Sequence, residues 1–172
     1  MTYKEYYNSN LMANERLAEL GQTLVSRRIE MPEGSSTTRL YREGPPRIIA
    51  KGVEELGEFF QALYEQDDNQ VNAEASQALY YLFAWTVYKV GNLDGLLAEL
   101  EKKQPSQRGM PQTLGHAVRK CSESMGRAYQ GLLSEAVDSD ECNLRVAEVI
   151  FNFQDAMAAA GKGSWEGVLA EI

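Results

Sequence analysis

The amino-acid sequence predicts an all-α helical bundle that contains an internally duplicated unit. Apolar residues recur at helical spacing along most of the chain, and no segment of useful length alternates apolar and polar residues as a strand would. The order of the expected helices and several polar positions return in the second half of the chain. A chain of 172 residues with 44% hydrophobic content can bury one core, or two small halves packed on each other.

The first expected element is a helix that ends near Arg28. Four leucines at helical spacing support it, namely Leu11, Leu17, Leu20 and Leu24. Residues 30–46 follow, and their proline, glycine and serine content is typical of a loop. A long helix is then expected over residues 47–64, and a polar turn follows it at residues 65–69.

The helix expected over residues 71–90 is apolar on nearly all sides, which predicts a central place in the bundle. Gly91 should end this helix, because glycine is favoured just after a helix C-terminus. A short helix is expected within residues 93–103. The segment KKQPSQRGMPQ, residues 102–112, is interpreted as a linker.

The pattern of residues 51–63 returns at residues 120–132, with lysine, glutamate, glycine, glutamine and leucine at the same five steps. Residues 165–172 match the short helix that follows Gly91, and residues 146–161 match the central helix. We interpret this order as the duplication of a unit with two long helices.

The duplication predicts two units. Residues 1–105 would hold the first helix, the loop and an acidic helical hairpin, and residues 106–172 a degenerate second hairpin packed on the first. The alternative is that two amphipathic hairpins look alike because helical cores require similar residues. That alternative does not explain the matched polar pairs, Lys51 with Lys120 and Gln61 with Gln130.

Charge and hydropathy limit the partners that we expect. A formal net charge of −8 argues against binding an extended phosphate backbone, although a metal can bring an acidic protein to a single polyphosphate. No apolar run approaches the roughly 20 residues that span a bilayer, and the N-terminal residues have no apolar core of the signal-peptide kind. We therefore expect no nucleic-acid or membrane partner, and a cytoplasmic location.

The inventory of nucleophiles excludes several enzyme classes. Cys121 and Cys142 form no CxxC pair, and His116 is the only histidine, so a zinc site or a Cys–His pair has little support. Both cysteines are expected to be reduced and structural. The chain contains neither a GxxxxGK[ST] phosphate loop nor a GxSxG elbow, so P-loop and serine-hydrolase chemistry are not expected.

An acidic stripe marks the helix expected over residues 47–64. At about 100° per residue, the stripe falls within an arc of roughly 100° and consists of Lys51, Glu54, Glu55 and Glu58. The opposite side is apolar and consists of Val53, Leu56, Phe59, Phe60, Leu63 and Tyr64. Such a stripe is either a solvated face, as on any surface helix, or a ligand set for a cation. Spacing alone leaves both interpretations open.

The chemistry of the stripe suits a hard cation. Like charges one helical turn apart repel, so the glutamates are not there to stabilise the helix. Mg²⁺ takes oxygen ligands and shares them with waters and substrate phosphates, and three carboxylates supply about half of such a shell. Glu74 on the following helix, with Gln77 one turn later, can contribute from the opposite wall of the hairpin. Lys51 is placed either to pair with the first two glutamates of the stripe or to reach a phosphate.

The motif EELGE, followed after 15 residues by EASQ, resembles the EExxE…ExxD signature of the MazG-like all-α nucleotide pyrophosphohydrolases. Upstream, the segment SSTTRLYREGPPRIIAKGVEELGE is similar to the opening segment of phosphoribosyl-ATP pyrophosphohydrolases. The positions that match in register are Ser35, Thr37, Leu40, Gly44, Arg47, Ile48, Lys51, Glu54, Glu55 and Glu58. The resemblance covers roughly residues 10–103.

This resemblance implies a hydrolase that acts on a phosphoric anhydride bond. The family cleaves a nucleotide between its α- and β-phosphates, releases pyrophosphate and depends on Mg²⁺, with Mn²⁺ as a second candidate ion. The expected partner is a small-molecule nucleotide. The upstream loop favours phosphoribosyl-ATP, whereas divergence from the family pattern favours a general nucleoside-triphosphate house-cleaning activity.

The resemblance also carries roles to single residues. The expected catalytic residues are Glu54, Glu55 and Glu58. The expected metal ligands, or residues that orient metal-bound water, are Glu54, Glu55, Glu58, Glu74 and Gln77. The expected substrate-binding residues are Ser35, Thr37, Arg47 and Lys51.

Two departures from the family pattern bear on activity. Gln77 stands where the second motif ends in aspartate, and its amide offers a neutral carbonyl oxygen without the charge that binds and polarises a cation. In the second half the stripe becomes Lys120, Glu123, Ser124 and Arg127, which cannot chelate a divalent cation in the same way.

The second hairpin is therefore interpreted as a structural partner that takes the place of a second subunit in homodimeric relatives. Its cations could instead assist with substrate phosphates if they face the acidic site. A duplicated chain could close the core as a monomer with an internal pseudo-dimer, or it could form a homodimer. The competing function class is a catalytically impaired helical binding or assembly protein derived from the same family.

Overall fold

The computed structural model describes residues 3–65, 67–102 and 113–171, and within them every regular element is an α-helix. The predicted all-α class is thereby confirmed. The helices are α1 (Tyr3–Glu30), α2 (Ser36–Glu43), α3 (Pro45–Glu65), α4 (Asp68–Val90), α5 (Asp94–Lys102), α6 (Leu114–Leu133), α7 (Ser139–Ala160) and α8 (Trp165–Glu171).

Local sequence signals set the ends of the long helices. The Asp67 carboxylate caps α4 by accepting hydrogen bonds from the backbone N–H groups of Asn69 and Gln70, at 3.0 and 3.2 Å. Gly91 ends α4 in the left-handed region at φ 101°, as predicted from its place after the apolar run. The α7 helix repeats this arrangement, with Asp138 as its N-cap and Gly161, at φ 64°, as its C-cap.

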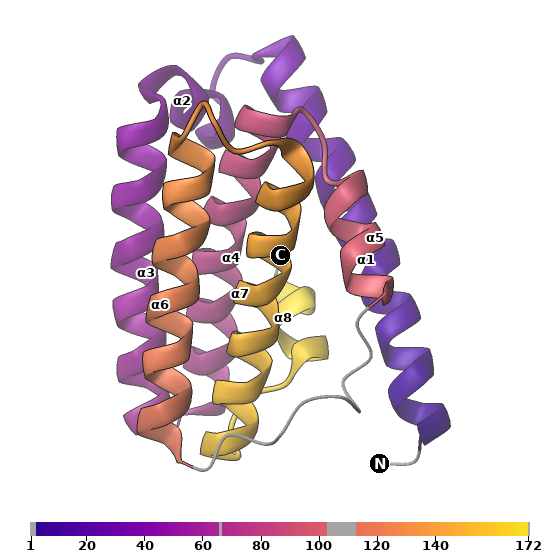
Figure 1. Ribbon diagram of the computed structural model, residues 1–172, viewed down its shortest axis with the longest axis vertical. Helices are drawn as coiled ribbons and strands as arrows, with labels where there is room; N and C mark the ends of the chain where they lie inside the picture. The colour runs from indigo at the N-terminus through magenta and orange to yellow at the C-terminus, as the bar shows by residue number, and fades with distance from the viewer. Residues whose placement is uncertain (1–2, 66, 103–112, 172) are drawn as a thin grey trace.

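Four long helices, α3, α4, α6 and α7, run side by side as a bundle (Figure 1). Short connections join α3 to α4 and α6 to α7, so each pair is an antiparallel helical hairpin. The long α1 helix lies along one flank of the bundle together with α5, and α8 packs against α1 and α4.

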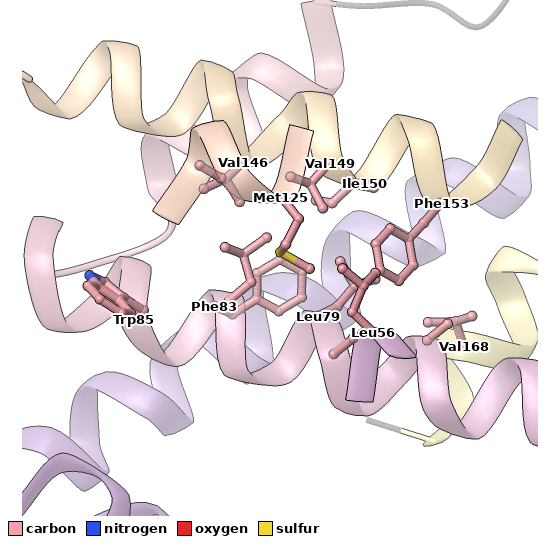
Figure 2. Packing of buried hydrophobic residues seen from close by; sticks show 14 of the residues in the cluster. Leu56, Leu79, Phe83, Trp85, Met125, Val146, Val149, Ile150, Phe153 and Val168 are labelled. Atoms are coloured by element: carbon pink, nitrogen blue, oxygen red, sulfur yellow. The ribbon is translucent and has the colours of Figure 1, made fainter. Parts of the chain in front are cut away.

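The two hairpins share one hydrophobic core (Figure 2). Phe83 of α4 and Met125 of α6 meet Val146 and Ile150 of α7 in its centre. The rings of Phe59 and Phe153, from different hairpins, stack with 4.5 Å between centroids. Because apolar residues of both hairpins are buried against each other, neither hairpin encloses a separate core.

The segment 30–46, expected to be a loop, contains the helix α2, so that prediction is wrong for residues 36–43. Ser35 caps α2, and Gly44 ends it at φ 78°. Leu40 and Tyr41 are buried, so packing of an amphipathic turn stabilises this short helix despite its proline- and glycine-rich flanks. Of the predicted linker, residues 103–112 lie outside the described residues.

The α3 helix is rotated relative to the predicted apolar and acidic sides. The sequence predicts Val53 and Tyr64 on the apolar side, but they are 54% and 62% exposed, whereas Glu55 of the stripe is buried. The buried arc is centred near Gly52 and Phe59, which puts Glu55 roughly 60° from its centre and Val53 about 100° away. Packing against both α4 and the second hairpin sets this rotation, and helical periodicity alone does not predict it.

Among the helices of the described residues, none combines the length and the apolar character that crossing a membrane requires.

Candidate functional site

Three carboxylates converge between α3 and α4. Glu55 and Glu58 lie one turn apart on α3, Glu74 reaches across from α4, and one oxygen of each lies within 4.8 Å of the other two. Glu55 is buried at 4% exposure, Glu74 is half-buried and Glu58 is exposed. One side of the group is therefore buried, and the other side is open to solvent.

The electrostatics of this group favour a cation. Burial raises the pKa of the Glu74 carboxyl above its ordinary value, and the negative charges of Glu58 and Glu55 raise it further. A positive charge among the three carboxylates would offset the repulsion from Glu58 and Glu55 and so favour the charged form of Glu74. Carboxylate oxygens are also the donors that hard divalent cations prefer, so the donor set fits such an ion.

Lys51 pairs with two of the glutamates in the stripe. Its ammonium nitrogen lies 2.8 Å from a carboxylate oxygen of Glu54 and 3.0 Å from one of Glu55. The hydrogen bonds to these carboxylates raise the pKa of Lys51, and the same lysine lowers the pKa of Glu54. Of the two roles expected for Lys51, the structure shows the pairing with Glu54 and Glu55. Glu54 lies outside the three-carboxylate group.

Gln77 is exposed and lies one turn after Glu74 on α4. Its amide nitrogen is 3.4 Å from a carboxylate oxygen of Glu74. The amide is thus beside the three-carboxylate group, where the related motif has an acid. An aspartate at this position would add a further negative charge next to Glu74.

The upstream residues tie α2 to its neighbours and lie outside the carboxylate group. Ser35 accepts a hydrogen bond from the backbone N–H of Thr38 at the start of α2. The Thr37 and Tyr80 hydroxyls are hydrogen-bonded at 2.7 Å, and Arg47 lies 3.3 Å from a carboxylate oxygen of Glu43. Their expected substrate-binding roles stay predictions.

A pocket that the sequence reasoning missed lies between α2, the first turn of α3 and α4. Its lining includes Arg39, Glu43, Arg47, Tyr80 and Tyr81. The α2 residues in this lining are spaced like one face of a helix, a signal that is invisible when the segment is interpreted as a loop.

Tyr81 links this pocket to the acidic stripe. Burial raises the pKa of the Tyr81 hydroxyl, and the charges of Lys51, Glu55 and Arg47 also act on it. The phenol is therefore within electrostatic reach of both the pocket arginine and the Lys51–Glu55 pair.

The second hairpin carries different chemistry at the matched positions. Arg127, which matches Glu58, pairs with Glu148 of α7 at 2.7 Å. Ser124, which matches Glu55, is buried and donates its hydroxyl hydrogen to the backbone carbonyl of Cys121 at 3.0 Å. The Arg127 guanidinium thus meets a carboxylate of its own hairpin.

Comparison with known proteins gives one family, which matches the first part of the chain. The family model of phosphoribosyl-ATP pyrophosphohydrolase matches residues 17–104. The phosphoribosyl-ATP pyrophosphatase of Leptospira biflexa is 34% identical over 89 residues, which is 52% of this chain and 97% of that relative. That of Rhodobacter capsulatus is 32% identical over 87 residues, 51% of this chain and 84% of the relative.

The histidine biosynthesis bifunctional protein HisIE of Bacillus subtilis is 36% identical over 85 residues, or 49% of this chain. The match spans only 41% of that bifunctional relative's own length. No solved structure matches the chain.

Proposed function

This chain belongs to the phosphoribosyl-ATP pyrophosphohydrolase family, whose model matches about half of it, and from that premise we propose a Mg²⁺-dependent nucleotide pyrophosphohydrolase. The proposed reaction is hydrolysis of phosphoribosyl-ATP between its α- and β-phosphates, with release of pyrophosphate. The observation that carries the proposal is the approach of three carboxylate oxygens, from Glu55, Glu58 and Glu74, to within 4.8 Å of one another.

Glu55, Glu58 and Glu74 would hold the cation, with Mn²⁺ as the alternative to Mg²⁺. When bound, such an ion polarises phosphate oxygens and lowers the pKa of water. The buried Glu55 is oriented by its 3.0 Å contact with Lys51, which fixes one wall of the site. Glu58, the exposed member, meets solvent and is proposed to accept the proton of the attacking water.

Lys51 is proposed to serve the substrate as well as the glutamates. An ammonium group has three N–H donors, and the contacts with Glu54 and Glu55 use two of them. The third can donate to a phosphate oxygen. Glu54 then orients Lys51, and in this proposal it contributes to catalysis through that lysine.

We propose the second hairpin as the structural partner of the first. The shared core and the Arg127–Glu148 pair support this role, since the second hairpin completes the bundle and neutralises its own charge. The division into residues 1–105 and 106–172, and its origin by duplication, belong to the same proposal. Light scattering would distinguish a monomer with an internal pseudo-dimer from a homodimer.

The test is a pyrophosphate-release assay on phosphoribosyl-ATP and the common nucleoside triphosphates, with Mg²⁺, Mn²⁺ or EDTA. We expect turnover of phosphoribosyl-ATP that requires the divalent ion. Turnover of the triphosphates alone would support the general house-cleaning activity. If no nucleotide is hydrolysed, the chain is the non-catalytic binding or assembly protein.

A further inference from the structure

The pocket between α2, α3 and α4 gathers two arginines around one carboxylate. The Nε atoms of Arg39 and Arg47 lie 3.8 and 3.3 Å from the two carboxylate oxygens of Glu43. Two cations facing one anion leave the pocket with an excess of positive charge. Each guanidinium carries five N–H donors, and the measured contacts involve one nitrogen of each, so donors remain for a ligand.

A contribution to stability does not explain why the two arginines face Glu43. Their ion pairs are exposed pairs at i,i+4 spacing, which contribute about 0.3–0.5 kcal/mol each. The arginines also line a pocket, with Tyr80 and Tyr81 on its α4 side. The hydrogen bond from α2 between Thr37 and Tyr80 fixes that wall. A walled, positively charged hollow is suited to a phosphate group.

The pocket lies at the N-terminal end of the α3 face, and the α3 members of the three-carboxylate group lie near the middle of the helix. Arg47, Lys51, Glu55 and Glu58 follow one another along that face at intervals of three or four residues. At 1.5 Å per residue, Arg47 is about 12 Å from Glu55 and about 17 Å from Glu58 along the helix axis. One face of α3 therefore carries positive charge at its N-terminal end and negative charge near its middle.

The proposed substrate has two anionic ends. Phosphoribosyl-ATP carries a triphosphate at one end and, as its name states, a phosphoribosyl group in addition. The end that is cleaved needs carboxylates and a metal, whereas a phosphate monoester without a metal needs cationic side chains.

We infer that Arg39 and Arg47 bind the phosphate monoester of the phosphoribosyl group, and that Glu43 holds both guanidiniums in place until this phosphate displaces it. The inference rests on the proposed function and assigns the end of the nucleotide remote from the cleaved bond. Tyr81 lines this subsite, and the charges of Lys51 and Glu55 also act on its hydroxyl. Nucleotides without the phosphate of the phosphoribosyl group lose these contacts. The subsite therefore sets the preference for phosphoribosyl-ATP over simple triphosphates.

A binding experiment tests the subsite without any catalysis. Ribose 5-phosphate serves as the probe, and its binding is followed by calorimetry at low salt for the wild type and for Arg39→Gln, Arg42→Gln and Glu43→Gln. Arg42 is the matched control, because it is exposed on the same helix and is not part of the pocket lining.

We expect the wild type and Arg42→Gln to bind the probe equally, and Arg39→Gln to bind it about tenfold more weakly. Glu43→Gln should bind it more tightly, because the competing carboxylate is gone. The inference is overturned if the wild type does not bind the probe, or if Arg39→Gln and Arg42→Gln behave alike.

A kinetic experiment separates the subsite from the proposed function. Arg39→Gln should lower kcat/KM for phosphoribosyl-ATP by about tenfold, mainly through KM, and should lower it much less for ATP. Equal losses for both nucleotides would contradict the subsite while leaving the pyrophosphohydrolase intact. Binding of ribose 5-phosphate by a protein that hydrolyses no nucleotide would instead contradict the proposed function alone.

Discussion

The α3–α4 and α6–α7 hairpins bury their apolar faces in the same core, but their charged side chains are arranged differently. In the second hairpin Arg127 meets Glu148, and the buried Ser124 satisfies its hydroxyl on its own helix. In the first hairpin Glu58 lies beside Glu55 and Glu74. A hairpin of this bundle can therefore pack without the three carboxylates.

This difference indicates that the acidic group is more than the polar face of an amphipathic helix. A solvated surface pair such as Arg127–Glu148 contributes about 0–1 kcal/mol to stability, and like charges contribute with the opposite sign. Lys51 offsets the charge of Glu55, but Glu58 and Glu74 still face like charge, which works against stability unless a further cation is bound. Such a conflict between stability and local charge is typical of functional sites.

The largest expected effect comes from giving the first hairpin the charge pattern of the second. Glu58→Arg places a cation beside Glu55 and Glu74, in the place where a metal would bind. We expect pyrophosphate release to fall by at least about 100-fold, while the Tm of the metal-free protein rises. An activity assay and a thermal melt in EDTA measure the two effects.

Glu148→Gln is the matched control for this substitution. It removes a carboxylate from the second hairpin and breaks the pair with Arg127. Activity should stay within about twofold of the wild type, since that pair is worth about 1 kcal/mol or less. A loss of activity comparable to that of Glu58→Arg would show that the second hairpin takes part in the chemistry.

The next effect concerns one of the contacts through which the second hairpin supports the first. A side chain at Gly52 would overlap the hydroxyl of Tyr129, which packs from α6 against α3 one residue after Lys51. Gly52→Ala should therefore lower the free energy of unfolding by about 1–3 kcal/mol. Urea unfolding followed by circular dichroism measures this change.

Two further variants make the Gly52 prediction specific. Gly57→Ala has open space around its added methyl group and should stabilise α3 by about 0.5–1 kcal/mol. Tyr129→Phe removes a buried hydroxyl for which no hydrogen bond is found among the described residues, and it should partly rescue Gly52→Ala. Equal effects at both glycines would show that the Tyr129 contact is unimportant.

A smaller effect is expected from Gln77→Asp. The added carboxylate lies next to Glu74 and should tighten divalent-metal binding about fivefold to tenfold, as judged by calorimetry. Gln130→Asp adds the same charge to an exposed position of α6 and should leave the affinity unchanged. Identical affinities for both variants would place Gln77 outside the ligand shell.

The smallest effect is on the pH dependence of the metal-free protein. The Glu74 pKa is raised on folding, so its contribution to stability is complete below its ordinary value of 4.5 and is lost as the pH rises through the raised value. Glu74→Gln should raise the Tm by about 1–2 °C at pH 7 and leave it unchanged near pH 4. Melts in EDTA at the two pH values measure this, and a Tm that falls at pH 7 would show that the charge of Glu74 does not destabilise the metal-free protein.

Periodicity was sufficient to predict the long helices, because their apolar residues recur over five or more turns and caps such as Gly91 mark their ends. It was insufficient for α2, whose eight residues are held by the burial of Leu40 and Tyr41 against other helices. The burial of Glu55 was missed for the same reason. The pattern of one helix does not show the directions from which α4 and the second hairpin pack against it.

The candidate site shows the same division between local and tertiary information. Helical spacing brings Glu55 and Glu58 together, and the family spacing pointed to Glu74, although their role as ligands stays a prediction. Tyr80 and Tyr81 lie within residues 71–90, whose apolar character predicts only a central place in the bundle. Their place in a pocket depends on where α2 docks, which no local pattern contains.

The most direct test of the account is calorimetric titration of the metal-free wild type, Glu58→Gln and Glu148→Gln with Mg²⁺, repeated with Mn²⁺. We expect the wild type and Glu148→Gln to bind the ion alike, and Glu58→Gln to bind it at least about tenfold more weakly. A wild type that binds neither ion, or three proteins with the same affinity, would contradict the claim that the first hairpin alone is a metal site.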